Sequence, residues 1–503
     1  MKAKDARLLR QRQRRIQRRL KKHRKSKATK KPVFTATNPR YEVAQRTRCV
    51  SAGGIGAMHS MAKRIGLVDA IDESLDLLKV HLPYHESDHV LNIAYNVLAG
   101  HTCLEDLELL RNDESYMDML GTARIPDPTT AGDFLRRFEP QDVESLMDAI
   151  NGVRKKMWGR LPQAQRKTAV IDVDGTLVGT AGEKKDGMSL SYNGVWGYHP
   201  LLVSLANFKE PLFIVNRPGN VVSHQDAAHW IDKAIALCRE SFEDVLVRGD
   251  TDFSQTKHLD RWDADGVRFV FGYDARKNLV EIADALPDKA WSKLTRRPKY
   301  AVATEPRTKR ASAKEAVVVA REYKNIRLQS EQIAEVEYQP GACKKKYRMV
   351  ILRKNLSVKK GEQWLFDDWR YFFYITNDRD FSTEEIVWQA NERCDQENLI
   401  GQLKSGVGAL RVPVYDLVSN GAYMVIASLA WSLKAWFGMT LPRAADRADI
   451  ARMQFKRFVN SVMLVPCQVL RQSRRVVLRL VAYTSRVRLL FRSMESTARL
   501  GFT

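Results

Sequence analysis

The stretch AVIDVDGTLVGT, residues 169 to 180, places two aspartates, Asp172 and Asp174, at the end of an apolar run. Side chains alternate along a strand, so both carboxylates can face the same side. Two chemistries suit such a pair. One aspartate could attack a phosphoester while the other moves a proton, or one could hold a divalent metal ion together with acids far downstream. The choice depends on which other acids the fold brings to this strand end.

A second acid, Asp250, follows a series of elements that predicts a single sheet. Strands at TAVIDVD, YHPLLVSLAN and PLFIVN precede a helix at HQDAAHWIDKAIALCRE, and DVLVRGD is a fourth strand. Ligands usually bind at the edge of such a sheet, where neighbouring strand ends meet. We therefore expect Asp174 and Asp250 to lie close together, with Mg²⁺ neutralising their repulsion.

A third acid for a two-metal site is available in NERCDQENLIGQLKSGVGALR, residues 391 to 411. At about 100° per residue, Arg393, Glu397 and Lys404 project from one face of a helix. Arg393 and Glu397 also form an i,i+4 pair of the kind that decorates solvated helices. A different face, which can be buried, carries Leu399, Ile400, Leu403 and Leu410.

The spacing Arg-x3-Glu-x6-Lys, followed by Ser-Gly-Val-Gly-Ala-Leu-Arg, resembles the signature of bacterial insertion-sequence transposases of the Asp-Asp-Glu (DDE) class. In that family a Tyr-x2-Arg-x3-Glu-x6-Lys helix supplies the third metal ligand, and its Arg and Lys grip the DNA backbone near the cut. The Tyr position is Ala390 here, which puts the role of the tyrosine in positioning DNA in doubt. Further blocks resemble the family at NRPGN, RGDTDF, PDPTTAGDFLRRF and MLVPCQVLRQSRRVVLRL, so the resemblance covers most of the chain from about residue 51.

The resemblance implies an α/β chain with a ribonuclease-H-like mixed-sheet core. The catalytic residues and metal ligands that it implies are Asp174, Asp250 and Glu397, with Mg²⁺ as the cofactor and Mn²⁺ as a possible substitute. The DNA contacts that follow on the same helix are Arg393, Lys404 and Arg411. Asp172 stays open as a partner of the site, a hydrogen-bonded structural acid or the true ligand.

The function that the resemblance implies is cleavage of double-stranded DNA at terminal inverted repeats and joining of the ends to target DNA. A homodimer would bridge two ends, in the nucleoid of a bacterial cytoplasm. Two rivals belong to other classes. A nuclease with the same core would cut without joining, and a DNA-binding protein descended from a transposase would bind without cutting. The intact set of three acids argues against the second rival.

The opening motif also resembles the first motif of haloacid-dehalogenase-type phosphatases, in which the first aspartate, Asp172 here, attacks phosphorus. That interpretation needs an acid at Ser254 or Gln255, and neither is acidic. It also predicts a helix after the motif, where the sequence predicts two further strands. The transposase interpretation instead makes Asp174, directly before Gly-Thr, the first catalytic acid.

Positive charge gathers at the two ends of the chain. The net charge is +24, of which residues 1–31 carry +15 and residues 441–503 carry +10, so the middle is nearly neutral. Such segments suit DNA, because each neutralised phosphate releases condensed counterions, although an anionic membrane would attract them too. We expect the N-terminal arm to be disordered without DNA. Its candidate DNA contacts are Arg14, Arg15, Arg18 and Arg19.

Two further patterns concern the surroundings of the chain. Six scattered cysteines without a Cys-x-x-Cys pair indicate a reducing compartment. The apolar run at 421–433 is too short to span a bilayer and predicts a buried helix. The expected units are a basic arm and linker (1–40), a helical N-terminal domain that could dock on DNA (41–160), a catalytic core in two parts (161–275 and 369–440), a β-rich insertion (276–368) and a basic helical C-terminal region (441–503).

Two smaller expectations concern single residues. Thr129 or Thr130 is expected to cap the helix in PDPTTAGDFLRRF. Trp364 and Trp369, at the end of the insertion, could stack on a flipped base, and core packing is the other interpretation.

Overall fold

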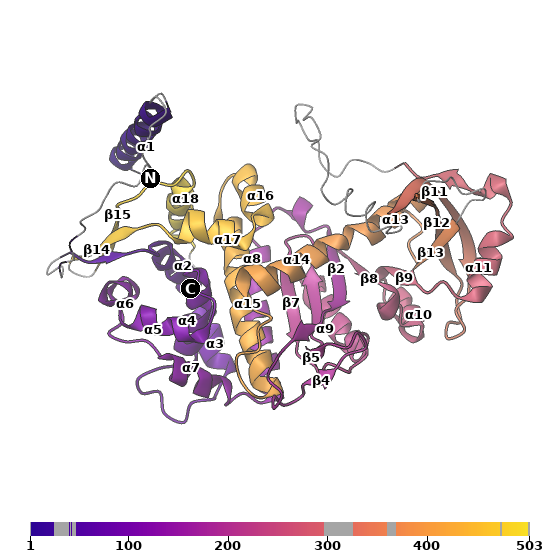
Figure 1. Ribbon diagram of the computed structural model, residues 1–503, viewed down its shortest axis with the longest axis horizontal. Coiled ribbons are helices and arrows are strands. Elements are labelled where there is room, and N and C mark those ends of the chain that lie inside the picture. The colour runs from indigo at the N-terminus through magenta and orange to yellow at the C-terminus, as the bar shows by residue number, and fades with distance from the viewer. Residues whose placement is uncertain are drawn as a thin grey trace.

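The computed structural model describes residues 2–24, 40, 42, 47–295, 325–359, 369–472 and 475–500. Figure 1 shows an elongated molecule with the N-terminal helices and the C-terminal elements at one end and the strands β11 to β13 at the other. The long helix α15 (Leu417–Thr440) stands between the N-terminal helices and the central strands.

The central sheet has nine described strands in the order β10-β11-β12-β13-β9-β8-β2-β6-β7. β2 (Thr168–Gly175) pairs in parallel with β8 (Asp244–Gly249), which pairs in parallel with β9 (Arg268–Tyr273). On its other side β2 pairs antiparallel with β6 (Leu201–Leu205), which pairs antiparallel with β7 (Glu210–Val215). This order and these directions confirm a mixed sheet with a ribonuclease-H-like core.

Both faces of this core are covered, which suits strands that are apolar along almost their whole length. All five residues of β6 are buried, as are Ile171 and Val173 of β2. Helix α9 (Ala227–Arg239) makes the connection from β7 to β8 and packs on β2, β6, β7 and β8. Helices α14 (Cys394–Gly401) and α15 contact β2 and β7, respectively.

The strands expected in a separate insertion continue the core sheet instead. β13 (Trp369–Thr376) pairs antiparallel with β9, and β12 (Tyr347–Lys359), β11 (Asn325–Tyr338) and β10 (Ser292–Lys293) follow in turn, each antiparallel to its neighbour. β13 joins the two parts physically, because one edge bonds to β9 and the other to β12.

The N-terminal domain is helical, as the apolar spacing predicts. Asp127, directly before Pro128, caps α7 by accepting a hydrogen bond from the backbone of Thr130 at 2.8 Å. The expectation that Thr129 or Thr130 is the cap is wrong, because proline fits the first helical position and leaves the residue before it as the cap. The helices are α2 (Gly54–Arg64), α3 (Leu67–Ser74), α4 (Glu86–Leu98), α5 (Leu107–Arg111), α6 (Glu114–Leu120), α7 (Pro128–Leu135) and α8 (Pro140–Trp158).

Helix α15 is buried along most of its length and packs against α4, α8 and β7. The apolar run at 421–433 is therefore a buried helix, as expected. Within the described residues, no helix combines the length and the apolar character needed to cross a membrane.

The C-terminal region is not wholly helical, which corrects the expectation from sequence. β14 (Cys467–Gln472) pairs antiparallel with both β15 (Arg475–Leu480) and β1 (Cys49–Val50), so the N-terminal and C-terminal parts of the chain share a three-stranded sheet. The run VVL in β15 is rich in β-branched residues, which favour strands. The elements of the region are α16 (Ala444–Arg452), α17 (Phe455–Phe458), β14 (Cys467–Gln472), β15 (Arg475–Leu480) and α18 (Val487–Thr497).

The N-terminal arm is also more ordered than expected, because it forms helix α1 (Ala3–Arg24). Leu, Arg, Gln and Lys are good helix formers, and the arm consists mostly of them. Leu9 is buried, and Arg12 donates a hydrogen bond to the carbonyl of Leu480 on β15 at 2.8 Å. Residues 25–39, which include most of the expected linker, lie outside the described residues.

Candidate active site

Asp172 is buried inside the sheet and bound to an arginine. Only 1% of the residue is exposed, and its two carboxylate oxygens accept hydrogen bonds from Arg248 at 2.7 and 3.0 Å. Arg248 lies directly opposite Asp172 in the parallel register of β2 and β8, and it also donates to the carbonyl of Gln389 on α13 (Thr383–Glu392). Burial raises the pKa of Asp172, and Arg248 opposes that rise. Asp172 is therefore a structural acid that joins β2, β8 and α13.

Asp174 and Asp250 share a single arginine. Asp174 lies near the end of β2, and Asp250 directly follows β8. A guanidinium nitrogen of Arg393 lies 3.3 Å from an oxygen of Asp174 and 3.7 Å from an oxygen of Asp250. The side chains of the two aspartates are 16% and 33% exposed, so both remain open to solvent. The structure thus brings together the two acids that the strand order predicts as neighbours.

Glu397 lies one helical turn after Arg393, on α14. The neighbouring Gln396 is buried, and its side-chain amide donates to the carbonyls of Asp172 at 3.0 Å and Leu202 at 3.1 Å. These bonds hold α14 across β2 and β6. The Glu397 side chain is exposed, and its negative charge raises the pKa of Asp174.

The electrostatics of this sheet end are unbalanced. Burial raises the pKa of Asp174 to about 7, with Arg393 opposing the rise and Asp250 and Glu397 adding to it. Burial also raises the pKa of Asp250, and Arg393 again opposes. Arg393 and Lys404 together do not neutralise three carboxylates, so the arrangement favours a further cation.

The two other expected DNA contacts of this segment, Lys404 and Arg411, lie in different places. Lys404 donates to the carbonyl of Leu177 at 2.8 Å, in the loop directly after β2, and Asp174 lies close enough to raise its pKa against the lowering caused by burial. Arg411 instead donates to the carbonyl of Thr102 in the N-terminal domain. Of these three expected DNA contacts, Arg393 and Lys404 therefore lie beside the acids and Arg411 does not.

The segment that carries these residues is not the single regular α-helix assumed from the sequence. Arg393 separates α13 from α14, and residues Gln402–Val407 form a π-helical turn. The expected apolar face survives this irregularity, because all four of its residues are buried: Leu399, Ile400, Leu403 and Leu410.

The other sequence candidates lie elsewhere. Trp369 packs its ring 4.5 Å from the guanidinium carbon of Arg353, whereas Trp364 lies outside the described residues. On α1, the four expected DNA contacts are all exposed: Arg14, Arg15, Arg18 and Arg19.

Comparison with known proteins identifies the family. The family model described as transposase DDE domain group 1 matches residues 42–501. The chain belongs to the DDE transposases. No curated protein matches this transposase. A cryo-EM structure of piggyBac transposase in a synaptic complex with hairpin DNA aligns with 10% identity and a TM-score of 0.35, over 82% of this chain and 81% of that chain.

The acids of the transposase suit the divalent metal ions that its family normally uses. Carboxylate oxygens are the hard ligands that such ions prefer. Arg393 already bridges Asp174 and Asp250 in the way that a bound cation would. Asp174 and Asp250 therefore fit a divalent ion at this sheet end, whereas the ligand atoms of these two acids and Glu397 do not all lie within 4.8 Å of one another.

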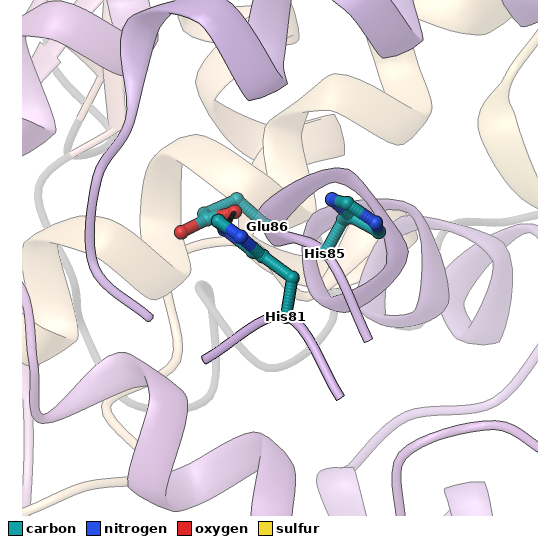
Figure 2. Close-up of side chains that lie close together, drawn as sticks. All are labelled: His81, His85 and Glu86. Atoms are coloured by element: carbon teal, nitrogen blue, oxygen red, sulfur yellow. Dashed lines mark hydrogen bonds and ion pairs between the residues drawn. The ribbon is translucent and has the colours of Figure 1, made fainter. Parts of the chain in front are cut away.

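A second group of possible metal ligands lies in the N-terminal domain. Figure 2 shows His81 beside Glu86, with the ring of His85 nearby. His81 donates to Glu86 at 3.0 Å, and the other carboxylate oxygen of Glu86 accepts from the backbones of Leu77 and Leu78. The two imidazole rings stack with centroids 4.7 Å apart and planes within 7°. Nitrogen lone pairs lie in the ring planes, so two parallel planes do not converge on one ion.

Sequence reasoning missed the residues that hold the acids in place. Arg248 precedes Asp250 by two residues, and Gln396 precedes Glu397 by one, so both stood inside the quoted motifs. An arginine within an otherwise apolar strand is a signal for a buried partner acid, because arginine is rarely buried unless it is paired. The register that selects Asp172 as that partner cannot be read from the sequence.

Proposed function

We propose that this DDE transposase is encoded by a bacterial insertion sequence of the Tyr-x2-Arg-x3-Glu-x6-Lys class. It binds double-stranded DNA at terminal inverted repeats, cleaves there with Mg²⁺ or Mn²⁺, and joins the cut ends to target DNA. A homodimer bridging two ends in the bacterial nucleoid completes the proposal. Family membership supports the transposase activity, and the resemblance of the Arg393–Lys404 segment supports the class.

The observation that carries the proposal is the shared contact of Asp174 and Asp250 with Arg393. Two partly exposed carboxylates beside one arginine, with Glu397 on the next helical turn, form a set of hard oxygen ligands. Divalent ions held by these three residues would supply activation of the attacking hydroxyl and stabilisation of the charge that develops on the phosphate.

Each step breaks one phosphodiester bond. In cleavage, water attacks phosphorus and the bond to the 3′ oxygen breaks, so the element ends in a 3′-hydroxyl. In joining, that hydroxyl attacks a phosphodiester of target DNA, forms the new bond and displaces the target's own 3′ oxygen. Both steps need the same placement of acids and scissile phosphate, so one site serves both.

Arg393 and Lys404 suit the scissile backbone in this scheme. Arg393 is partly buried beside the acids, where a cationic side chain interacts more strongly with phosphate than it does in bulk water, and Lys404 is exposed with Asp174 nearby. Arg393 contacts the two aspartates that would hold a metal ion, so its guanidinium would be free to turn to the DNA backbone once these acids are neutralised.

The phosphatase alternative loses its nucleophile. Asp172 would have to attack phosphorus, yet it is 1% exposed and both of its oxygens are bonded to Arg248. Asp174, which is partly exposed and free of such a bidentate contact, is the better candidate for the first catalytic acid.

The test uses DNA from either side of the gene, incubated with purified protein and Mg²⁺. We expect cleavage at the tips of the inverted repeats together with joined products, and we expect loss of both in Asp250→Asn and Glu397→Gln. Asp252→Asn is the matched control for Asp250, because this nearby aspartate is exposed and follows β8 as well. Cleavage without joined products would support the nuclease, and strand transfer retained by Asp250→Asn would refute the site.

A further inference from the structure

A cavity of about 520 Å³ lies at the end of β2 opposite the three acids. Thr168, the first residue of β2, lines it, together with the turn between β6 and β7, the second half of α15, and α16. None of these residues belongs to the candidate active site.

The charge of this cavity has one sign. Five basic residues line it, and among the described residues that line it none is Asp or Glu. Lys209 does have an acidic neighbour outside the lining, Asp395, at 3.4 Å. The five basic residues are Lys167, Lys209, Lys434, Arg447 and Arg452.

Lys434 is the unusual member of this set because it is buried. Only 2% of the residue is exposed, and its ammonium lies 4.0 Å from the centre of the Trp431 ring. Trp431 is itself fixed, since its indole nitrogen donates to the carbonyl of Lys209 at 2.6 Å. Burial, together with the nearby positive charge of Lys209, lowers the pKa of Lys434 to about 7.

A buried lysine without a carboxylate is costly, because desolvation of the ammonium is uncompensated. Lysines in such positions are usually paired with an acid, and here the ammonium lies over the Trp431 ring with the positive charge of Lys209 nearby. An anion entering the cavity would meet Lys434 at its wall, with the more exposed Lys167 and Arg452 beside it. The cavity therefore has the composition of an anion site.

We propose that this cavity binds a phosphate group of the DNA backbone, with Lys434 as its most deeply buried contact. The inference rests on the proposed function, which makes DNA the polyanion that the chain handles. DNA is favoured over a free phosphate because the region at 441–503, to which the α16 wall of the cavity belongs, carries a net charge of +10.

The cavity also has a physical connection to the active-site helix. Asp395, the partner of Lys209, lies on α14 directly before Gln396 and two residues before Glu397. A phosphate that draws Lys209 toward the cavity would compete with this ion pair.

The experiment measures binding of a fluorescent duplex that carries the element end to the full chain. The variant is Lys434→Met, and the matched control is Lys289→Met, which removes an exposed lysine elsewhere. We expect Lys434→Met to weaken binding by about 3- to 10-fold and to lower the slope of log affinity against log salt by about 0.9, the value for one phosphate contact. The Lys289→Met control should stay within twofold of the original.

A second arm uses inorganic phosphate alone. We expect phosphate to raise the melting temperature of the original protein more than chloride at equal ionic strength, and to do so less in Lys434→Met. Since methionine removes a buried unpaired ammonium, the variant should melt no lower than the original, which excludes misfolding as a cause of weaker binding.

The outcomes separate the two proposals. Normal DNA binding and an unchanged salt slope in Lys434→Met would overturn the inference and leave the proposed function standing. A phosphate response that depends on Lys434 without any effect on DNA would assign the cavity to free phosphate and overturn the DNA assignment. A chain that does not bind element-end DNA at all would overturn both.

Discussion

The two ends of β2 differ in their balance of charge. At one end Asp174 and Asp250 contact a single arginine, Arg393, and the negative charge of Glu397 lies close enough to act on Asp174. At the other end five basic side chains line a cavity, and no acid is among the described residues that line it. The eight-residue strand β2 thus has an excess of carboxylates at one end and an excess of basic side chains at the other.

Two buried acids of the core have matched partners. Asp172 and Arg248 bond through two contacts, and Glu210 bonds to Arg154, Trp158 and Trp436 inside the core. Buried charges are tolerated when every one has a partner, and groups with strongly shifted pKa values gather at functional sites. The difference teaches that matched charges in this fold hold elements together, whereas unmatched charges indicate where a ligand binds.

The largest effect that we expect is the loss of activity when one of the acids at the acidic end of β2 is replaced. Asp174→Asn should lower cleavage and joining by at least about 10³-fold, because an essential group is removed. The same change should raise the melting temperature of the metal-free protein, since it removes one of the crowded carboxylates. The measurements are product formation on element ends and thermal unfolding with EDTA.

Mg²⁺ provides the control for that result. The ion should raise the melting temperature of the original protein and have a smaller effect on Asp174→Asn. A loss of activity accompanied by a lower melting temperature would contradict the view that Asp174 is an unmatched acid, because it would indicate a structural role.

The next largest effect is on stability, at the matched pair. Asp172→Leu should cost about 3 kcal/mol of unfolding free energy, because it leaves Arg248 buried without its partner. The double variant Asp172→Leu with Arg248→Met should recover much of this loss, since it removes both charges. Urea unfolding of the two variants measures the difference. A double variant as unstable as the single one would show that the unpaired charge of Arg248 is not the cause of the lost stability.

The sequence predicts the residues at the acidic end of β2 better than those at the basic end. Strand order follows from local apolar runs, so the sheet core, the neighbourhood of Asp174 and Asp250, and the burial of α15 could all be expected. The choice between Asp172 and Asp174 depends on the register of β2 against β8, which is a non-local property. The cavity around Lys434 combines three segments that are distant in sequence, and the continuation of the sheet into β11 and β12 depends on pairing across β13. Neither leaves a local pattern.

Local propensity was available for two features that sequence reasoning missed. The N-terminal arm is rich in helix-forming residues, and it is helix α1 in the structure. The alternation and β-branching of RVVLRL fit strand β15, although the surrounding charge suggested a helical tail.

A smaller effect is expected from Lys434, in the dependence of stability on pH. Its pKa is about 7 in the folded chain against 10.5 when unfolded, with Lys209 as the charged group that adds to the lowering by burial. Between pH 7 and 10.5 the unfolded chain therefore binds more protons than the folded one. Stability contributed by this residue should rise with pH in that window, by about 1.4 kcal/mol per unit, and its penalty is fully present below pH 7.

Lys434→Met should remove this dependence. Unfolding free energies of the original and the variant, measured at pH 6.5, 7.5 and 8.5, should differ most at the lowest pH, where the variant is the more stable protein. Parallel curves for the two proteins would show that Lys434 has an ordinary pKa and that the basic end carries no penalty.

The smallest effect is expected at the ion pair of Lys209 and Asp395. Lys209 lines the basic cavity, and Asp395 lies on α14, the helix that carries Glu397. Their side chains are 31% and 36% exposed and 3.4 Å apart, so Asp395→Asn should change stability by less than about 1 kcal/mol. Without this acid, Lys209 can turn toward the cavity, so DNA affinity should rise. The rise should be only roughly 2-fold, because an exposed charge contributes about as little to binding as an exposed ion pair contributes to stability. Asp288→Asn, which removes an exposed acid elsewhere, is the control for net charge. An equal gain in both variants would attribute the effect to overall charge, whereas a gain in Asp395→Asn alone ties the affinity to the cavity at the basic end of β2.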